Sequence, residues 1–130
     1  MKVLALDYGS ARTGVAVSDV TGTLARPLGV VERASTPQGL DRVVALIEDE
    51  GVERVVVGLP LTLRGEHGKQ ARETELFVAA LRARIAIPIE SFDERFTTAI
   101  AAQTPSSSSE DARAAAHLLA SYLEWSSGRA

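Results

Sequence analysis

The sequence has no cysteine, and this absence excludes two broad classes of site. Without thiols the chain forms no disulfide, and it binds no zinc or iron–sulfur cluster through cysteine ligands. Such a composition suits the reducing cytoplasm, so we expect a cytoplasmic protein. No apolar run approaches the roughly 18 residues of a membrane-spanning helix. The first residues run directly into an apolar strand pattern, so we also expect no signal peptide.

An excess of positive charge is also missing. The chain has 14 Lys and Arg against 17 Asp and Glu, and its formal net charge is −3. This balance argues against tight, non-specific binding of nucleic acid, but it leaves room for a local basic face. The chain has 130 residues, of which 45% are hydrophobic. Length and composition are those of one globular domain, so we expect residues 1–130 to form a single domain.

Short apolar runs predict strands, and apolar residues at helical spacing predict the helices between them. Three strands come first, and helices then alternate with two further strands. This order indicates an α/β fold: a mixed five-stranded sheet, a three-strand meander followed by alternating β and α elements, with helices on both faces. In chain order, we expect strands at Lys2–Asp7, Gly14–Ser18 and Leu28–Glu32, a helix at Pro37–Glu50, a strand at Arg54–Gly58, a helix after Gly65 or Gly68, a strand over Ile85–Ile89, and helices at Phe96–Ala102 and Glu110–Trp125.

The first expected helix has clear signals at both ends. Ser35 or Thr36 precedes it and can cap its first N–H groups. Pro37 suits the first turn, where its missing N–H costs no hydrogen bond. Gly51 is expected to close the helix, because glycine adopts the left-handed conformation found at helix ends.

Acidic residues stand where strands end and where the last helix begins. Asp7 ends the first strand, and Asp111 opens the final helix. Asp93 and Glu94 follow the last expected strand. Ligands of open α/β sheets bind beyond the carboxyl ends of the strands, so we expect these acids to meet at one edge. A cluster of oxygen ligands suits Mg²⁺ or Mn²⁺, which also offsets the cost of an acid on a buried strand.

Each of these acids also has a structural interpretation. Asp7 can accept backbone N–H bonds in the turn that follows it. Asp93 can be the N-cap of the next helix. Asp111 lies three residues after Ser108, the spacing of a capping box, and the helix dipole favours an acid in a first turn. For Asp111 the local sequence favours the cap.

The segment Gly58–Ala71 (GLPLTLRGEHGKQA) leads from a strand into a helix. A helix start offers free N–H groups and a partial positive charge to a phosphate. Arg64, Lys69 and Arg72 add cations nearby, although an ordinary solvated connecting loop is the alternative. The two histidines, His67 and His117, are expected to be surface or structural residues.

Four segments together resemble one protein family. They occur in the order LALDYGSARTGVAVSD at 4–19, VVVGLPL at 55–61 with Gly65 after it, DERFTTAIA at 93–101 and DARAAAHLLASYLE at 111–124. In this order and spacing they resemble the YqgF/RuvX family of Holliday-junction-resolvase-like nucleases of bacteria. The resemblance covers nearly the whole chain. It implies a ribonuclease H-like fold, in agreement with the predicted order of elements.

The resemblance implies a nuclease that depends on a divalent metal, Mg²⁺ or Mn²⁺. Asp7, Glu94 and Asp111 match the metal-binding acids of the family, and Asp93 is the neighbour of one. The implied function is hydrolysis of phosphodiester bonds in 5′-end processing of pre-16S rRNA. Two alternatives stay open: a Holliday junction resolvase that acts on branched DNA as a dimer, and a non-catalytic nucleic-acid or ribosome-assembly binding protein.

We expect a nucleic-acid partner, structured RNA or branched DNA, bound by a monomer or a homodimer. Two departures from the family pattern bear on this contact. Gln103–Glu110 is short and serine-rich where relatives carry Lys and Arg, so a basic contact is expected to be missing. Thr62 stands where the family usually has Asn. The candidates for phosphate contacts are Arg12, Arg64, Lys69, Arg72 and Arg95.

Overall fold

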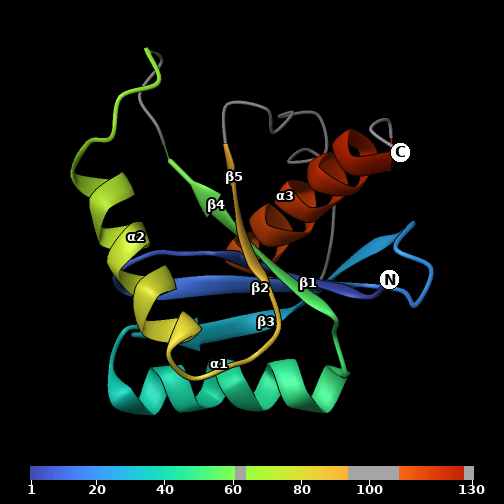
Figure 1. Ribbon diagram of the computed structural model, residues 1–130, viewed down its shortest axis with the longest axis horizontal. Coiled ribbons are helices and arrows are strands. Elements are labelled where there is room, and N and C mark those ends of the chain that lie inside the picture. The colour runs from blue at the N-terminus through green and yellow to red at the C-terminus, as the bar shows by residue number, and fades with distance from the viewer. Residues whose placement is uncertain (61–63, 94–108, 128–130) are drawn as a thin grey trace.

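The computed structural model describes residues 1–60, 64–93 and 109–127 (Figure 1). The elements in this part of the chain are β1 (Val3–Asp7), β2 (Arg12–Ser18), β3 (Ala25–Glu32), α1 (Pro37–Glu50), β4 (Arg54–Leu59), α2 (Lys69–Arg82), β5 (Ile89–Asp93) and α3 (Glu110–Ser127). None of these described helices is long and apolar enough to cross a membrane. The helix predicted at Phe96–Ala102 lies outside the described residues.

The five strands form one mixed sheet in the order β3-β2-β1-β4-β5. β1, β2 and β3 are an antiparallel meander, in which Asp7 of β1 pairs with Gly14 of β2. β4 lies parallel to β1 on its other side, and β5 lies parallel to β4. The carboxyl ends of β1, β4 and β5 therefore share one edge of the sheet. The predicted mixed five-stranded sheet with a three-strand meander is confirmed.

Helices cover both faces of the sheet, as predicted (Figure 1). Leu4 and Leu6 of β1 belong to the core that the sheet forms with α1 and α2. Val3 and Ala5 belong to the core under α3. Because side chains alternate between the faces of a strand, Asp7 belongs to the face that α3 covers.

The ends of α1 agree with the signals in the sequence. The N-cap is Thr36, whose hydroxyl accepts the N–H of Gly39 at 3.1 Å. Pro37 is the first helical residue. Gly51 ends the helix in the left-handed conformation, with φ of 62°.

The last strand lies further along the chain than the sequence predicted. We expected a strand over Ile85–Ile89, but β5 begins only at Ile89 and ends at Asp93. Pro88 has no N–H to give to a sheet, although its carbonyl accepts the N–H of Val55 at 3.0 Å. Asp93 is therefore the final residue of β5 and does not follow it.

Candidate active site

Asp7 lies half-buried at the carboxyl end of β1, where the chain turns back into β2. The hydroxyl of Thr13, which is fully buried, bridges this turn: it accepts the N–H of Gly9 and faces the Gly9 carbonyl, both at 3.4 Å. A Cβ atom at Gly9 would lie 2.5 Å from the carbonyl oxygen of Arg12, so the turn requires glycine there. A tight, internally bonded turn thus fixes the place of Asp7.

The start of α3 reaches the same edge because Gly14 has no side chain. Gly14 pairs directly with Asp7, so the two residues face the same side of the sheet, with Cβ positions about 5 Å apart in such a pair. A Cβ atom at Gly14 would lie 1.9 Å from the backbone carbonyl oxygen of Asp111. The first turn of α3 therefore packs against Gly14, the strand partner of Asp7. Sequence analysis named Gly14 only as the first residue of an expected strand and missed this role.

The carboxylate of Asp111 forms an ion pair with Arg12, with Oδ2 3.2 Å from Nε. The capping box predicted between Ser108 and Asp111 needs correction. α3 begins at Glu110, and Ser109 caps it by accepting the N–H of Ala112 at 3.2 Å. Asp111 is thus the second residue of the helix, and its side chain reaches across to β2.

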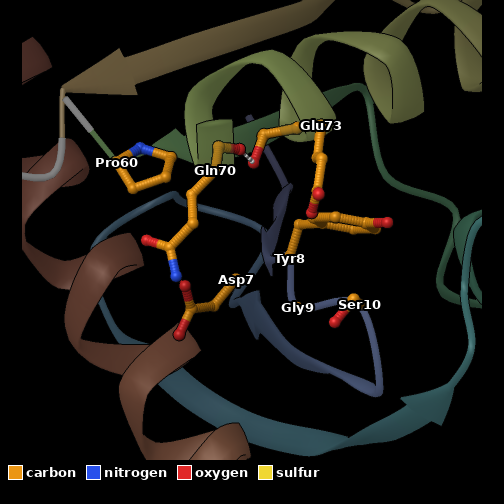
Figure 2. Close-up of a pocket in the computed structure, with 8 residues that line it drawn as sticks. Asp7, Tyr8, Gly9, Ser10, Pro60, Gln70 and Glu73 are labelled. Atoms are coloured by element: carbon orange, nitrogen blue, oxygen red, sulfur yellow. Dashed lines mark hydrogen bonds between the residues drawn. The ribbon is translucent and has the colours of Figure 1, made fainter. Parts of the chain in front are cut away.

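A cavity of about 140 Å³ opens beside Asp7, between the turn after β1 and the start of α2 (Figure 2). The side chain of Gln70, in the first turn of α2, extends toward the Asp7 carboxylate (Figure 2). Tyr8 stacks on Phe77 of α2, with ring centroids 4.6 Å apart, and so holds the turn against the helix. Sequence analysis assigned no role to most of the residues that line the cavity, which are Asp7, Tyr8, Gly9, Ser10, Pro60, Gln70, Glu73 and Thr74.

Three predicted phosphate contacts lie around the start of α2. Arg64, Lys69 and Arg72 are all exposed. The N-cap of α2 is Gly68, which offers no side-chain acceptor to the first N–H groups of the helix. Exposed cations and an uncapped helix start suit a phosphate, and the role of these residues stays a prediction.

In the described residues, the other predicted acids are not shown around Asp7, although Glu73 lines the same cavity. Ile89 belongs to the core under α1 and α2 and Phe92 to the core under α3, so strand alternation assigns Asp93 to the face opposite Asp7. Glu94 and Arg95 lie outside the described residues. Within residues 1–60, 64–93 and 109–127, no three His, Asp or Glu side chains form a group that could hold a metal ion. The structure thus places the backbone of Asp111 against Gly14, the strand partner of Asp7, and the shared metal site of the acids remains a prediction.

Both histidines lie where the sequence suggested. His67 is exposed, and its Nδ1 is 2.6 Å from Oε1 of Glu75. His117 is buried on α3, and its Nε2 has no hydrogen-bond partner in the part of the chain that the structure describes. Neither side chain lines the cavity beside Asp7.

A second polar group, the Arg54 cluster (Arg54, Glu90 and Tyr122), lies at the amino ends of β4 and β5, away from the carboxyl end of β1. Nη1 of Arg54 donates to the Tyr122 hydroxyl at 2.9 Å, and that hydroxyl donates to Oε1 of Glu90 at 3.0 Å. Nη1 of Arg54 also lies 3.5 Å from the same Glu90 oxygen. Burial raises the pKa of Tyr122, and its hydrogen bonds to Arg54 and Glu90 oppose each other in this effect. The hydrogen bonds of the cluster link α3 to β4 and β5.

Comparison with known proteins settles the family. The sequence model of RuvX, Holliday junction resolvase, matches residues 1–125. The chain belongs to the RuvX family. A "Putative pre-16S rRNA nuclease" of Chloroflexus aggregans is 46% identical over 101 residues, which are 78% of this chain and 71% of the relative. A protein of the same description in Rubrobacter xylanophilus is 44% identical over 135 residues. The alignment covers 98% of this RuvX-family chain and 95% of the relative.

Solved structures similar to this RuvX-family chain agree with its fold. RuvC of T. thermophilus, in complex with a Holliday junction substrate, has a TM-score of 0.69 and 18% identity, with 98% of this chain and 96% of RuvC covered. The Fowlpox virus resolvase, in complex with Holliday junction DNA, has a TM-score of 0.60 and 12% identity, with 96% and 98% covered. At such low identity the likeness bears on the fold alone. The predicted ribonuclease H-like fold is confirmed.

Proposed function

We propose that this chain is a divalent-metal-dependent nuclease that hydrolyses phosphodiester bonds in the 5′-end processing of pre-16S rRNA. The observation that carries the proposal is the close approach of the start of α3 to Gly14, the strand partner of Asp7, next to a cavity that Asp7 lines. Membership of the RuvX family and the description of the two relatives support the choice of reaction and substrate. A single domain over residues 1–130 and a cytoplasmic location are parts of this proposal.

The residues at this edge fit a divalent cation. The carboxylate of Asp111 already accepts a cationic group, the guanidinium of Arg12. Asp7 and Asp111 offer only oxygen ligands, the type that Mg²⁺ and Mn²⁺ prefer. Asp7, Asp111 and Glu94 would hold the metal. When bound, the metal supplies an activated water and stabilises the leaving oxygen of the phosphodiester.

The chain itself positions the acids and the substrate. The bonded turn keeps Asp7 in place, and contact with Gly14 fixes the backbone of Asp111. The backbone at both acids therefore needs little reorganisation before the reaction. Arg64, Lys69 and Arg72 surround the start of α2 and would hold phosphates of the same strand, with Arg95 as a further candidate.

A second candidate function is resolution of Holliday junctions. The observation in its favour is the likeness of the fold to RuvC over nearly the whole chain. A resolvase cuts two strands of a junction, so this function requires a homodimer that presents two Asp7–Asp111 sites. A non-catalytic role in ribosome assembly is the remaining alternative.

A cleavage assay with two substrates tests the proposal. The purified chain is incubated with a pre-16S rRNA 5′-leader transcript and with a four-way DNA junction, in Mg²⁺, Mn²⁺ or EDTA. We expect the transcript to be cut in either metal, to stay intact in EDTA, and to stay intact with Asp7→Asn. Symmetric cutting of the junction alone would favour the resolvase. Binding of the transcript without any cutting would contradict a nuclease function and favour the binding protein.

A further inference from the structure

The Arg12–Asp111 ion pair joins two residues for which different ligands are expected. The proposed function assigns Asp111 to the metal, and the sequence makes Arg12 a candidate for a phosphate contact. In the structure the two side chains bind each other, with Nε 3.2 Å from Oδ2. The Asp111 oxygen that accepts the guanidinium is not free for a metal ion in the same direction. A metal ion that binds this oxygen from the same side therefore has to displace Arg12.

We propose that Arg12 is the counter-ion of Asp111 before metal binds, and that it moves to a phosphate of the substrate when the cation takes its place. This inference rests on the proposed function and deepens it. It identifies the residue that couples metal loading to nucleic-acid binding. An arginine suits both positions, because guanidinium binds carboxylate and phosphate oxygens in the same geometry.

The two partners differ in their freedom to move. Arg12 is the first residue of β2, and its side chain is 66% exposed, so it can reorient without disturbing the core. The Asp111 side chain is 38% exposed, and its backbone rests on Gly14. The acid is therefore the fixed partner, and the arginine is the one that leaves.

The charges make this exchange reversible. An ion pair as exposed as this one stabilises a protein only weakly, so a divalent cation with several oxygen ligands can replace the guanidinium. Once the cation is bound, it repels Arg12, while a phosphate nearby attracts it. Before that, Arg12 neutralises an acid that would repel the substrate. Metal and nucleic acid should consequently bind with positive cooperativity.

A Mn²⁺ titration followed by thermal melting tests the first half of the exchange. Arg12→Ala removes the competing cation, so the Mn²⁺ concentration at half-maximal stabilisation should fall about two- to five-fold relative to the unaltered chain. The matched control is Arg26→Ala, because Arg26 is also an exposed strand arginine, paired with Glu50 at 3.5 Å. The control should leave the midpoint unchanged. Equal midpoints for Arg12→Ala and the unaltered chain would overturn the exchange while leaving the metal site intact.

Binding of a fluorescein-labelled RNA hairpin tests the second half, by anisotropy at 4 °C with the integrity of the probe checked on a gel. Arg12→Ala should weaken binding several-fold in Mn²⁺ and by much less in EDTA, because Arg12 is held by Asp111 when metal is absent. Arg72→Ala serves as a plain phosphate contact and should weaken binding equally in both conditions. An equal loss for Arg12→Ala in both conditions would overturn the exchange. If Mn²⁺ stabilises none of the proteins, the proposed function fails as well.

Discussion

The two edges of the sheet hold the same kinds of side chain in different arrangements. At the amino end of β4, the Arg54 cluster closes on itself: one buried tyrosine hydroxyl joins an arginine and a glutamate. At the carboxyl end of β1, Asp7 lines a cavity, and Asp111 pairs with an arginine whose side chain is largely exposed. Arg54 and Glu90 also border a pocket, but their shared tyrosine hydroxyl links α3 to two strands. At the carboxyl end of β1, the charged groups can take a ligand without breaking such a link.

This difference separates a structural polar group from a candidate site. A buried hydroxyl with both partners in place contributes to stability, and a ligand there would have to break those bonds. If the carboxylates of Asp7 and Asp111 share a site as proposed, they repel each other, and a cation relieves that repulsion. We therefore expect changes in the Arg54 cluster to lower stability, and changes at the Asp7 edge to alter metal and nucleic-acid binding.

Gly14→Ala should have the largest effect, because it should lower stability and also weaken the response to Mn²⁺. The new methyl group would lie 1.9 Å from the Asp111 carbonyl oxygen, so the first turn of α3 has to move. Overpacking of this kind costs about 1–3 kcal/mol of unfolding free energy. Urea denaturation measures this cost, and a Mn²⁺ titration should show a weaker stabilising effect. Gly29→Ala is the control, since nothing lies within 4 Å of a Cβ atom there. A fully stable variant with unchanged Mn²⁺ response would contradict the role given to Gly14.

The double variant Arg64→Ala and Lys69→Ala tests whether the start of α2 contacts phosphates of the substrate. If both residues contact phosphates, RNA affinity at low salt should fall about tenfold, and the slope of log K against log salt should flatten by about 2. The melting temperature should hardly change, because both side chains are exposed. An unchanged salt slope would identify the segment as an ordinary connection.

Tyr122→Phe tests the structural role of the Arg54 cluster. The change deletes the hydroxyl that bridges Arg54 and Glu90 but keeps the ring. We expect a loss of about 1–2 kcal/mol in the free energy of unfolding and unchanged Mn²⁺ binding. Tyr8→Phe is the control for removing a hydroxyl from the other tyrosine. If Tyr122→Phe left stability intact, the Arg54 cluster would not have the structural role assigned to it.

Asp19 should give the smallest effect, limited to acid conditions. Its carboxylate accepts the Thr21 hydroxyl and the N–H groups of Leu24 and Thr23, and these bonds lower its pKa well below the ordinary value. Because the folded pKa is the lower one, the contribution is present above about pH 4 and is lost as the pH falls below it. Asp19→Asn should therefore reduce the loss of stability between pH 4 and pH 2, whereas Asp49→Asn on α1 should not. If the two variants lost stability equally between pH 4 and pH 2, the turn at Asp19 would not be the source of the acid sensitivity.

Much of the fold follows from local patterns in the sequence. Buried strands such as β1 and β4 are short apolar runs, and α1 carries its own cap residues. β5 was misplaced because its residues alternate weakly in polarity and the apolar run before it contains Pro88. Where that strand begins depends on pairing with β4, which no local pattern encodes.

The site was predictable in its acids and not in its contacts. Asp7 and Asp111 stood out as acids at element ends, in motifs that match a family. The pairing of Arg12 with Asp111 joins residues far apart in the chain, and it depends on how closely α3 approaches β2. The place of Gln70 likewise depends on how α2 packs against the turn after β1. These are properties of tertiary packing.

The most direct test of the metal site is a paired thermal melt and cleavage assay on Asp7→Asn and Asp111→Asn, with and without Mn²⁺. If the two acids share a cation, each variant should lose cleavage by more than about 100-fold, because changes even outside the ligand shell cost about 10–100-fold. Each should also lose most of the stabilisation by Mn²⁺ and melt no lower than the unaltered chain without metal. Full cleavage by both variants, with an undiminished response to Mn²⁺, would contradict the account.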